Sequence, residues 1–590
     1  MASQYVIGID LGTTNSVLAY AALADEKPQV QLLSIPQLTA AATVENRDSL
    51  ASFVYQAGKH EKGAFDLSWA KGRQYAVGEY ARRQSAEFPD RTIGAAKSWL
   101  CHSKVDRHQP ILPWNAPEDT PKISPITASR YYLQHLIAAW EEQFPDAPVK
   151  DQQVVLTVPA SFDVSARELT REAAREAGLP DTLILLEEPQ AAVYSWLAVM
   201  GDKWRKMLRV NEKLLVCDVG GGTTDLTLVG VAEENGELTL ERIAVGNHLL
   251  VGGDNMDLAL AHYAAGLFEK QKVKLNPWQS VSLWHSCRAA KEILLAEDGP
   301  ESTTVSVLGR GSKLIGGTVS VELEAAAVKK LLVDGFLPEC SLTDRPSRQR
   351  ASGFLEIGLP FESDTAITRH LSAFLQSHGA DEAVEPTHVL FNGGVFRSDA
   401  LRSQLLSVIR GWFTDDAAQL LAGDHDLDHA VARGAAYYGH VKQQGGMRIR
   451  GGAARSYYIG IETAGLAIPG APRPLRALCV VPQGMEEGAE TDVPSGEVGL
   501  VLGEPAQFRF FSSNVRRQDR PGDLLSSWDE EELVETDSLE TILPPDEHAD
   551  DAYVPVRFRS HITELGVFEL WCVSANSDAR WKLEFSVREE

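Results

Sequence analysis

One pattern of residues occurs twice in this chain. The segment YVIGIDLGTTNSVLAY, residues 5–20, is an apolar run that ends in an aspartate, followed by a glycine-containing turn, two threonines and a second apolar run. The segment LLVCDVGGGTTDLTLVGV, residues 214–231, repeats that order. Apolar runs on both sides of a short turn are typical of a β-hairpin. Two copies of one hairpin predict two lobes of similar fold.

Each hairpin has an aspartate at the end of a strand that should be buried on both faces. These residues are Asp10 and Asp218. A buried carboxylate costs several kcal/mol unless a cation or strong donors face it. Glycine permits close backbone approach, so successive N–H groups can converge on an anion, and threonine hydroxyls add further donors. The predicted anion-binding residues are Gly12, Thr13, Thr14 and Asn15 in the first hairpin and Gly220, Gly221, Gly222, Thr223 and Thr224 in the second.

Two such loops that face each other across a cleft would clamp the β- and γ-phosphates of a nucleotide. The two carboxylates would then hold Mg²⁺ through its retained waters. This site would differ from the common phosphate-binding loop, which carries a lysine. One hairpin alone would be read as an ordinary tight turn, and the second copy favours the phosphate clamp.

Charge and length restrict the remaining classes of protein. A net charge of −26 argues against a nucleic-acid backbone as partner, because that binding requires surplus Lys and Arg. The N-terminus lacks a basic segment followed by a long apolar run, and no run of about 18 apolar residues occurs, so we expect a cytoplasmic protein outside the membrane. The 6 cysteines have no C-x-x-C spacing, which predicts small buried hydrophobes rather than a zinc site or disulfides.

The chain divides into two regions by its hydrophobic pattern. Strand-like and helix-like runs alternate through residues 1–440, which predicts α/β layers. A Gly-rich basic segment, residues 441–456, has the composition of a linker. Short alternating strands follow at 457–590 and predict a β-sandwich or partial barrel. Within it, the strongly acidic residues 528–551 are predicted to be a solvated loop.

Seven segments together resemble one known family. GIDLGTTNS, VCDVGGGTTDLTLV, LTVPASF, LEEPQAAVYSWL, GGDNMD, NGGVFRS and DHAVARGAA occur in the order found in the 70-kilodalton heat-shock chaperones, the DnaK-like proteins. The resemblance is strong over residues 5–439 and weak over 456–587. It implies an actin-like two-lobed ATPase domain of the duplicated ribonuclease H-like fold, followed by a β-sandwich that binds peptide. It also implies ATP or ADP and Mg²⁺ as ligands, with K⁺ as a further candidate ion.

The resemblance assigns catalytic roles to residues of the matching motifs. Lys97 in RTIGAAKSWLCH resembles the lysine beside the γ-phosphate, and Glu188 in LEEPQAAV resembles the glutamate that positions water or Mg²⁺. Thr223 matches the threonine near the γ-phosphate, and Asp225 an aspartate close to the metal and K⁺ sites. Together with Asp10 and Asp218 they form the predicted catalytic and metal-binding set. Taken alone, Lys97 would be read as a surface lysine and Glu188 as a helix cap.

The adenosine end of the predicted site departs from the family. Gly393, Gly394, Arg397 and Asp428 match the family residues around the α-phosphate, ribose and adenine. On the facing helix, the segment CRAAKEILLAED places Arg288, Lys291, Glu292 and Leu295 where the family has an acidic residue, a lysine, a basic residue and a serine. Only the lysine agrees, which puts adenosine affinity and base preference in question. The alternative is that Arg288 and Glu292, four residues apart, form a surface ion pair.

The C-terminal half of the pattern also diverges. The segment GGMRIRGGAARSYY replaces the acidic, leucine-containing linker of the family, so the usual docking contact is not expected to form. The β region, which begins YYIGIETAGLAIPG, is equally compatible with binding extended peptide and with recruiting a fixed partner. No segment for a helical lid follows WKLEFSVREE in this sequence.

The favoured function is an ATP-hydrolysing chaperone that binds unfolded peptide segments and works with co-chaperones. A nucleotide-dependent interaction or scaffold protein with little turnover is the second hypothesis, and the retained Lys97, Glu188 and Thr223 weigh against it. A small-molecule kinase on the same fold is the third, and the chaperone-type motifs make it the least favoured.

Overall fold

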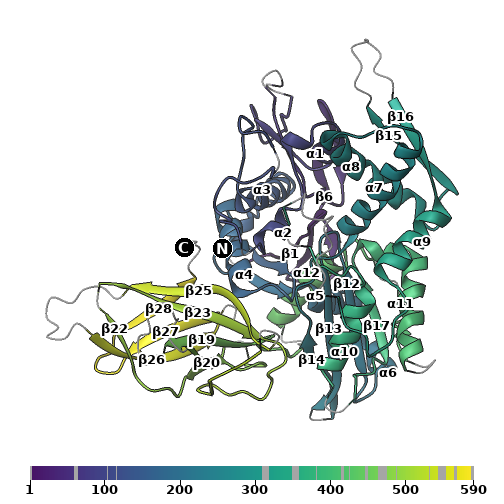
Figure 1. Ribbon diagram of the computed structural model, residues 1–590. Coiled ribbons are helices and arrows are strands. Elements are labelled where there is room, and N and C mark those ends of the chain that lie inside the picture. Colours follow the sequence, from purple (N-terminus) through teal and green to yellow (C-terminus); the bar gives the residue numbers. More distant parts are fainter. Residues whose placement is uncertain are drawn as a thin grey trace, which may run out of the picture.

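A computed structural model gives the fold of the chain. It describes residues 3–58, 61, 64–102, 104–114, 116–234, 236–308, 318–347, 358–359, 361–379, 382–413, 417–423, 426–444, 449–462, 475–486, 488–501, 503–529, 532–542, 553–563 and 568–585. Two large mixed sheets lie in residues 5–444, and a separate β-rich unit follows on one side (Figure 1).

The first sheet is built around the first hairpin. Strands β1 (Tyr5–Leu11) and β2 (Asn15–Ala22) pair antiparallel, and β1 pairs parallel with β10 (Gln153–Val158) on its other side. The sheet order is β11-β10-β1-β2-β3, with β6 also paired to β2. The remaining strands are β11 (Ile184–Glu187), β3 (Gln31–Leu32) and β6 (Leu50–Ala51).

The second sheet repeats this arrangement around the second hairpin. Its order is β14-β13-β12-β17-β18, with antiparallel pairs on one side of β12 and parallel pairs on the other. The strands are β12 (Lys213–Val219), β13 (Thr224–Glu234), β14 (Glu237–Val245), β17 (His388–Asn392) and β18 (Gln419–Leu420). In each sheet the first strand of the hairpin is central, so the duplication read from the sequence is present in the fold.

Helices cover both sheets, and three small strand groups accompany them. The helices are α1 (Glu79–Glu87), α2 (Ala96–Leu100), α3 (Pro125–Gln143), α4 (Val164–Ala177), α5 (Glu188–Met200), α6 (Trp204–Met207), α7 (Gly253–Lys270), α8 (Pro277–Leu294), α9 (Ala325–Phe336), α10 (Ile367–Ser377), α11 (Asp399–Trp412) and α12 (Ala430–Gln444). The smaller strands are β4 (Ile35–Ala40), β5 (Thr43–Arg47), β7 (Val54–Gln56), β8 (Tyr75–Val77), β9 (Thr92–Ile93), β15 (Ser302–Leu308) and β16 (Thr318–Glu324).

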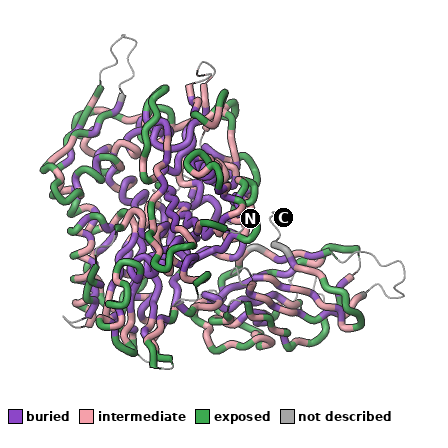
Figure 2. The backbone as a smooth tube through the Cα atoms, turned by 180° about the vertical axis from the view of Figure 1, so that it is seen from behind, coloured by how far each residue is buried: buried purple, intermediate pink, exposed green. Residues whose placement is uncertain are grey.

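Helix α12 lies between the sheets and packs on both lobes. A side chain at Gly8 of β1 would come within 2.3 Å of the backbone nitrogen of Ala436, and one at Gly434 within 1.7 Å of the carbonyl oxygen of Ala191 in α5. Glycine is required at both crossings because the backbones approach so closely. Figure 2 shows from behind that the buried backbone is concentrated in this two-sheet region. The site between the lobes therefore rests on a closely packed centre.

Helix α12 continues to Gln444, four residues into the segment predicted as linker. The Nε2 atoms of His440 and Gln444 contact the carbonyl oxygens of Asp25 (2.8 Å) and Leu23 (3.2 Å), and these contacts hold the last turn against the first lobe. The linker therefore begins later than the composition of the segment predicted.

The C-terminal unit is a β-sandwich whose strands run in the order β21-β26-β27-β28-β25-β23-β19-β20-β24, with β22 paired to β26. Its strands are β19 (Ser456–Glu462), β20 (Leu475–Val481), β21 (Glu490–Asp492), β22 (Val498–Val501), β23 (Pro505–Ser513), β24 (Leu524–Leu525), β25 (Val534–Ile542), β26 (Tyr553–Ile562), β27 (Phe568–Ser574) and β28 (Arg580–Phe585). Side chains from many of these strands pack in one buried apolar cluster, which includes Ile459, Phe510 and Leu570. No helix occurs among the described residues of this unit.

The acidic segment 528–551 was predicted to be a loop, and that prediction is wrong for residues 534–542. They form β25, which pairs with β23 and β28. Leu539 points into the core at 1 % exposure, and Thr541, two positions further along the strand, is also buried. In the rest of the predicted loop, residues 528–529 and 532–533 form neither helix nor strand, and residues 530–531 and 543–551 lie outside the described residues.

None of the helices in the described ranges combines the length and apolar character that a membrane crossing requires.

Candidate functional site

A cavity of about 280 Å³ opens between the two lobes, and most of the predicted site residues form its walls. From the predicted set, the cavity is lined by Asp10, Gly12, Thr13, Thr14, Asn15, Lys97, Glu188, Asp218, Gly220, Gly221, Thr223, Arg288, Lys291, Glu292, Leu295, Gly393, Gly394, Arg397 and Asp428. Residues from both hairpins and from helices α2, α5 and α8 thus surround one space. Three predicted residues, Gly222, Thr224 and Asp225, do not line it.

The turns of the two hairpins meet directly. A Cβ atom at Gly221 would lie 2.1 Å from the Thr14 hydroxyl oxygen, and one at Gly222 would lie 2.4 Å from the hydroxyl oxygen of Ser98. Any larger side chain at these glycines would push the lobes apart. The backbone N–H groups and hydroxyls of both turns are therefore concentrated at one end of the cavity. This is the end that the sequence predicted to hold phosphates.

Lys97 and Glu188 form a buried ion pair across that end. Lys97 lies on the short helix α2, is 8 % exposed, and its Nζ contacts Glu188 Oε1. Burial alone would lower the pKa of Lys97, but the charges of Glu188 and Asp10 raise it above its usual value. The alternative of a surface lysine is wrong. Glu188 is the first residue of α5, after the N-cap residue Glu187, and its carboxylate binds the lysine.

Four carboxyl groups, that of Glu188 included, lie close together at this end of the site: Asp10, Glu188, Asp218 and Asp225. Burial and the charge of Glu188 raise the pKa of Asp10 to about 7. The same two causes raise the pKa of Asp218 well above its usual range, and burial raises the pKa values of Glu188 and Asp225. Lys97 contacts one member of this group, so the group carries an excess of negative charge. That excess is the electrostatic signature of a site built for a cation.

A magnesium ion fits this donor set. Mg²⁺ prefers oxygen ligands and usually keeps several waters. Asp218 accepts a hydrogen bond from Asn392 Nδ2 (2.8 Å) and Asp10 one from Thr157 Oγ1 (3.3 Å), which orient both carboxylates. The buried Oδ1 of Asn392 has no hydrogen-bond partner. Within the described residues, no group of three or more His, Cys, Asp or Glu side chains lies close enough to bind one ion directly.

Behind the second hairpin, Asp225 is held by two residues that the sequence analysis missed. It accepts hydrogen bonds from the backbone N–H and the hydroxyl of Ser161, and that hydroxyl lies 2.7 Å from His248 Nδ1. Burial lowers the pKa of His248 to about 3, so the ring is neutral. Ser161 lies inside the motif LTVPASF, which was the available signal. Thr224 is also occupied, because its hydroxyl donates to the carbonyl oxygen of Val251 at 2.8 Å.

At the other end of the cavity, Arg288 is turned toward helix α7. Its guanidinium binds Asp254 and, through Nε, Asp257 Oδ2 at 2.8 Å, and its side chain is 11 % exposed. Lys291 also binds Asp257, at 2.6 Å. The alternative of a surface ion pair between Arg288 and Glu292 is therefore wrong. Arg288, which stands where the family has an acidic residue, is thus paired with the aspartates Asp254 and Asp257 of its own lobe.

Arg397 and Asp428 face each other at the mouth of the cavity. Arg397 follows the glycine turn after β17, in a single turn of 3₁₀ helix, η5 (Gly394–Arg397). Its Nε donates to Asp428 Oδ1 at 2.7 Å, and its side chain is 56 % exposed. The sequence assigned both residues to the same pocket, and the structure brings them into contact.

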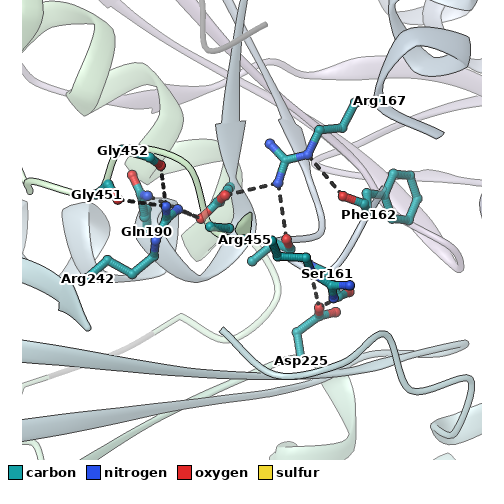
Figure 3. A network of polar contacts seen from close by, with 12 residues as sticks. Ser161, Phe162, Arg167, Gln190, Asp225, Arg242, Gly451, Gly452 and Arg455 are labelled. Carbon is teal, nitrogen blue, oxygen red and sulfur yellow. Dashed lines mark hydrogen bonds and ion pairs between the residues drawn. The ribbon is translucent and has the colours of Figure 1, made fainter. Parts of the chain in front are cut away.

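A network of charged residues joins this site to the linker (Figure 3). Glu187, the neighbour of Glu188, binds Arg167 and Arg242, and these cations lower its pKa although burial opposes them. Arg242 also donates to the carbonyl oxygens of Gly451, at 2.9 Å, and Gly452. The family-type linker side chains are missing, yet the linker still contacts the α/β region through its backbone.

The linker backbone also pairs with the edge of the second sheet. Arg242 donates its N–H to the carbonyl oxygen of Arg450 (2.7 Å), and Arg450 donates to Leu240 (2.9 Å). Next to it, the guanidinium of Arg455 is buried and donates to the carbonyl oxygen of Gly246 at 3.3 Å. The sequence gave no sign that a basic linker residue would be buried. A cavity of about 760 Å³ lies between this linker, α4, β14 and the sandwich.

Comparisons with known proteins find a matching family model and similar curated proteins. The family model described as "Hsp70 protein" matches residues 6–307. The Chaperone protein DnaK of Stenotrophomonas maltophilia is 28 % identical over 282 residues, and that of Thermosipho melanesiensis is 32 % identical over 268 residues. Each match covers 45 % of this chain but only 38 % and 37 % of the two relatives. The region that the family model matches, residues 6–307, includes the turns of both hairpins, Lys97 and Glu188.

Proposed function

We propose that this chain, which belongs to the Hsp70 protein family as its motifs indicated, binds ATP with Mg²⁺ between its lobes, hydrolyses it and acts as a chaperone. The observation that carries the proposal is the convergence in one cavity of two glycine-threonine turns, the buried pair of Lys97 and Glu188, and the surplus of carboxylates. Phosphate groups need the donors, and a metal ion needs the acids.

The residues at the phosphate end have separable roles in this proposal. Backbone N–H groups and the hydroxyls of Thr13, Thr14 and Thr223 hold the phosphates. Lys97 offsets the negative charge that spreads over the γ-phosphate oxygens during hydrolysis. Glu188 fixes Lys97 and accepts a hydrogen bond from the attacking water, and its raised pKa suits it to share a proton. When bound, Mg²⁺ would neutralise phosphate charge near Asp10 and Asp218.

The adenosine end supports a weaker hold on the base than on the phosphates. Leu295 and Arg397 line the space where the base would lie. Arg288 is already bound to two aspartates of α7, so it is not free to take the place of the family acid at the ribose. We expect affinity to come mainly from the triphosphate and the metal, with modest discrimination between ATP and GTP.

Phosphate release in the presence of Mg²⁺ tests the enzymatic proposal. Lys97→Met and Thr223→Val should each reduce single-turnover hydrolysis by about 10²-fold or more, the range found when one preorganised transition-state donor is removed. Lys330→Met is the matched control, because Lys330 is 76 % exposed and pairs with Asp334 away from the cavity. Equal release by all four proteins would refute the catalytic roles. ATP binding without release would favour the scaffold alternative, and release only with an added acceptor would favour a kinase.

For the C-terminal sandwich we propose binding of extended, apolar peptide segments, with co-chaperones as further partners. Support comes from family membership and from the contact between the units: Val164 of α4 belongs to the apolar cluster of the sandwich, and Asn514 Nδ2 donates to Asn247 Oδ1 at 2.9 Å. The entry loop of the sandwich, residues 463–474, lies outside the described residues. A labelled apolar peptide should bind with different affinity in Mg²⁺-ATP and Mg²⁺-ADP. Nucleotide-independent affinity would refute the coupling, and no binding would refute the peptide role.

A further inference from the structure

Described residues between helices α9 and α10 contact both lobes. Both helices contribute to the core cluster of the second lobe, through residues such as Leu332 and Leu371. Between them, Leu359 is 4 % exposed and belongs to the core cluster of the first lobe, which includes Trp99 and Leu112. We call the described residues Gly358, Leu359 and 361–364 the strap.

In the first lobe the strap is held by an aromatic group next to α2. His102 Nδ1 accepts the N–H of Lys104 (3.2 Å), so the proton of the neutral ring is on Nε2, which donates to the carbonyl oxygen of Gly358 (3.0 Å). Burial lowers the pKa of His102 and keeps the ring neutral. A Cβ atom at Gly358 would lie 2.5 Å from the indole nitrogen of Trp114, and the backbone of Gly358 has a positive φ of 85°. The strap is thus fitted closely against the first lobe.

In the second lobe the strap is fixed within a few residues. The N–H of Glu362 donates to the carbonyl oxygen of Leu250 at 3.3 Å. Asp364 accepts the N–H groups of Ala366, at the start of α10, and Ser347 at 2.9 and 2.8 Å. It also binds Arg369 at 2.9 Å. The hydrogen bonds of Asp364 to backbone groups and to Arg369 lower its pKa against the effect of burial, so it is ionised at neutral pH.

The two anchor points are the supports of the catalytic residues. On the first lobe, the ring of Trp99 on α2 stacks with that of His102 at 5.4 Å, and the same helix carries Lys97. On the second lobe, the loop 249–251 that receives the strap also binds Thr224 at both its N–H and its hydroxyl. Thr224 is adjacent to Thr223 in the second hairpin. The strap therefore spans from the support of Lys97 to the support of the opposite turn.

We propose that the strap is a positioning element for the reaction: it holds Lys97 in place against the second hairpin and slows the opening of the cleft through which nucleotide leaves. This inference rests on the proposed function, since it concerns the same site. The strap residues bind no nucleotide themselves and act through α2 and the loop 249–251. Opening the lobes would have to withdraw Leu359 from the core of the first lobe and break the bond between His102 and Gly358.

The test compares Leu359→Ala with Leu337→Ala. Leu337 lies on the same connection, is 1 % exposed and packs in the second lobe, so its truncation costs similar packing without touching the first lobe. We expect Leu359→Ala to release a fluorescent ADP analogue about tenfold faster or more, because a buried Leu→Ala change weakens the closed state selectively. Leu359→Met should restore slow release, since Met fills a similar volume. Leu337→Ala should release at the wild-type rate despite a lower unfolding temperature.

Amide hydrogen exchange of the nucleotide-free protein supplies a second readout. Residues 96–102 should lose protection in Leu359→Ala but not in Leu337→Ala. Equal release rates and equal protection in the two variants would overturn the role of the strap. If the wild type fails to bind the ADP analogue, the proposed function fails, while the exchange experiment still decides whether the strap holds α2.

Discussion

Replacing Asp10 by asparagine should make the nucleotide-free protein more stable while removing its response to nucleotide. Asp10 and Glu188 are close enough to repel each other, and burial adds to that cost, so the pKa of Asp10 rises from 3.8 to about 7. A folded-state pKa above the unfolded value means that the folded protein holds this proton more tightly. Ionised Asp10 therefore destabilises the free protein at neutral and alkaline pH.

The magnitude follows from the size of that shift. At ~1.4 kcal/mol per pKa unit, a rise of about three units corresponds to on the order of 4 kcal/mol. Water reaching the partly exposed carboxylate reduces the figure to on the order of 2 kcal/mol. The cost of the wild-type charge is full above pH 7, declines as the pH falls through the folded pKa, and vanishes below the unfolded pKa near 4. The stabilising effect of Asp10→Asn should follow the same course.

Chemical denaturation of both proteins at pH 8, 6 and 4 without nucleotide measures this effect. Asp364→Asn is the matched control of opposite sign, because hydrogen bonds and Arg369 hold the pKa of Asp364 below its usual value. That variant should be less stable than the wild type at pH 8, and the loss should shrink as the pH falls below 4. If Asp10→Asn is destabilising at pH 8, or if its effect does not depend on pH, the carboxylate cluster is not under the strain inferred here.

Three further predictions concern the surroundings of the site. Arg242→Ala should cost about 3–5 kcal/mol of stability by leaving Glu187 short of a buried partner, and amide exchange of the linker strand should increase. Arg288→Leu should cost about 3–5 kcal/mol because it leaves Asp254 and Asp257 with one fewer buried cation, measurable by thermal unfolding. Chelation of Mg²⁺ should remove most of the stabilisation by ATP, which is about 2.7 kcal/mol at ~100 times the dissociation constant. Unchanged unfolding in any of these would contradict the corresponding contact.

The grouping of the hairpin residues at one end of the cavity could be predicted from sequence because the pattern is local. A hairpin carries its aspartate, glycine and threonines within a few residues, and the second copy at Asp218 identified the first at Asp10 as part of a pair. The duplication also predicted two lobes of similar fold, and the two sheets repeat one arrangement around their hairpins. The α/β character of the first region and the β character of the second were likewise readable from their hydrophobic periods.

The features that sequence reasoning missed depend on contacts between distant residues. Arg288 was read against Glu292 on its own helix, whereas its partners lie on α7, 31 and 34 positions earlier. Leu359 carries no sign in the sequence that it leaves its own lobe. Strand β25 was hidden because acidic residues dominate the composition of its segment. Local patterns give the type of an element and its chemistry, but tertiary packing selects the partner of a long charged or apolar side chain.

The central claim is that the cavity between the two hairpins is a site for a nucleotide with its metal ion. Thermal unfolding of the wild-type protein with ATP, ADP or GTP, each with Mg²⁺ and with excess chelator, tests it most directly. Mg²⁺-ATP and Mg²⁺-ADP should raise the unfolding temperature of the protein, and GTP should raise it to a lesser degree. The chelator should remove most of this increase. An unfolding temperature that does not change with any nucleotide at millimolar concentration would contradict the claim.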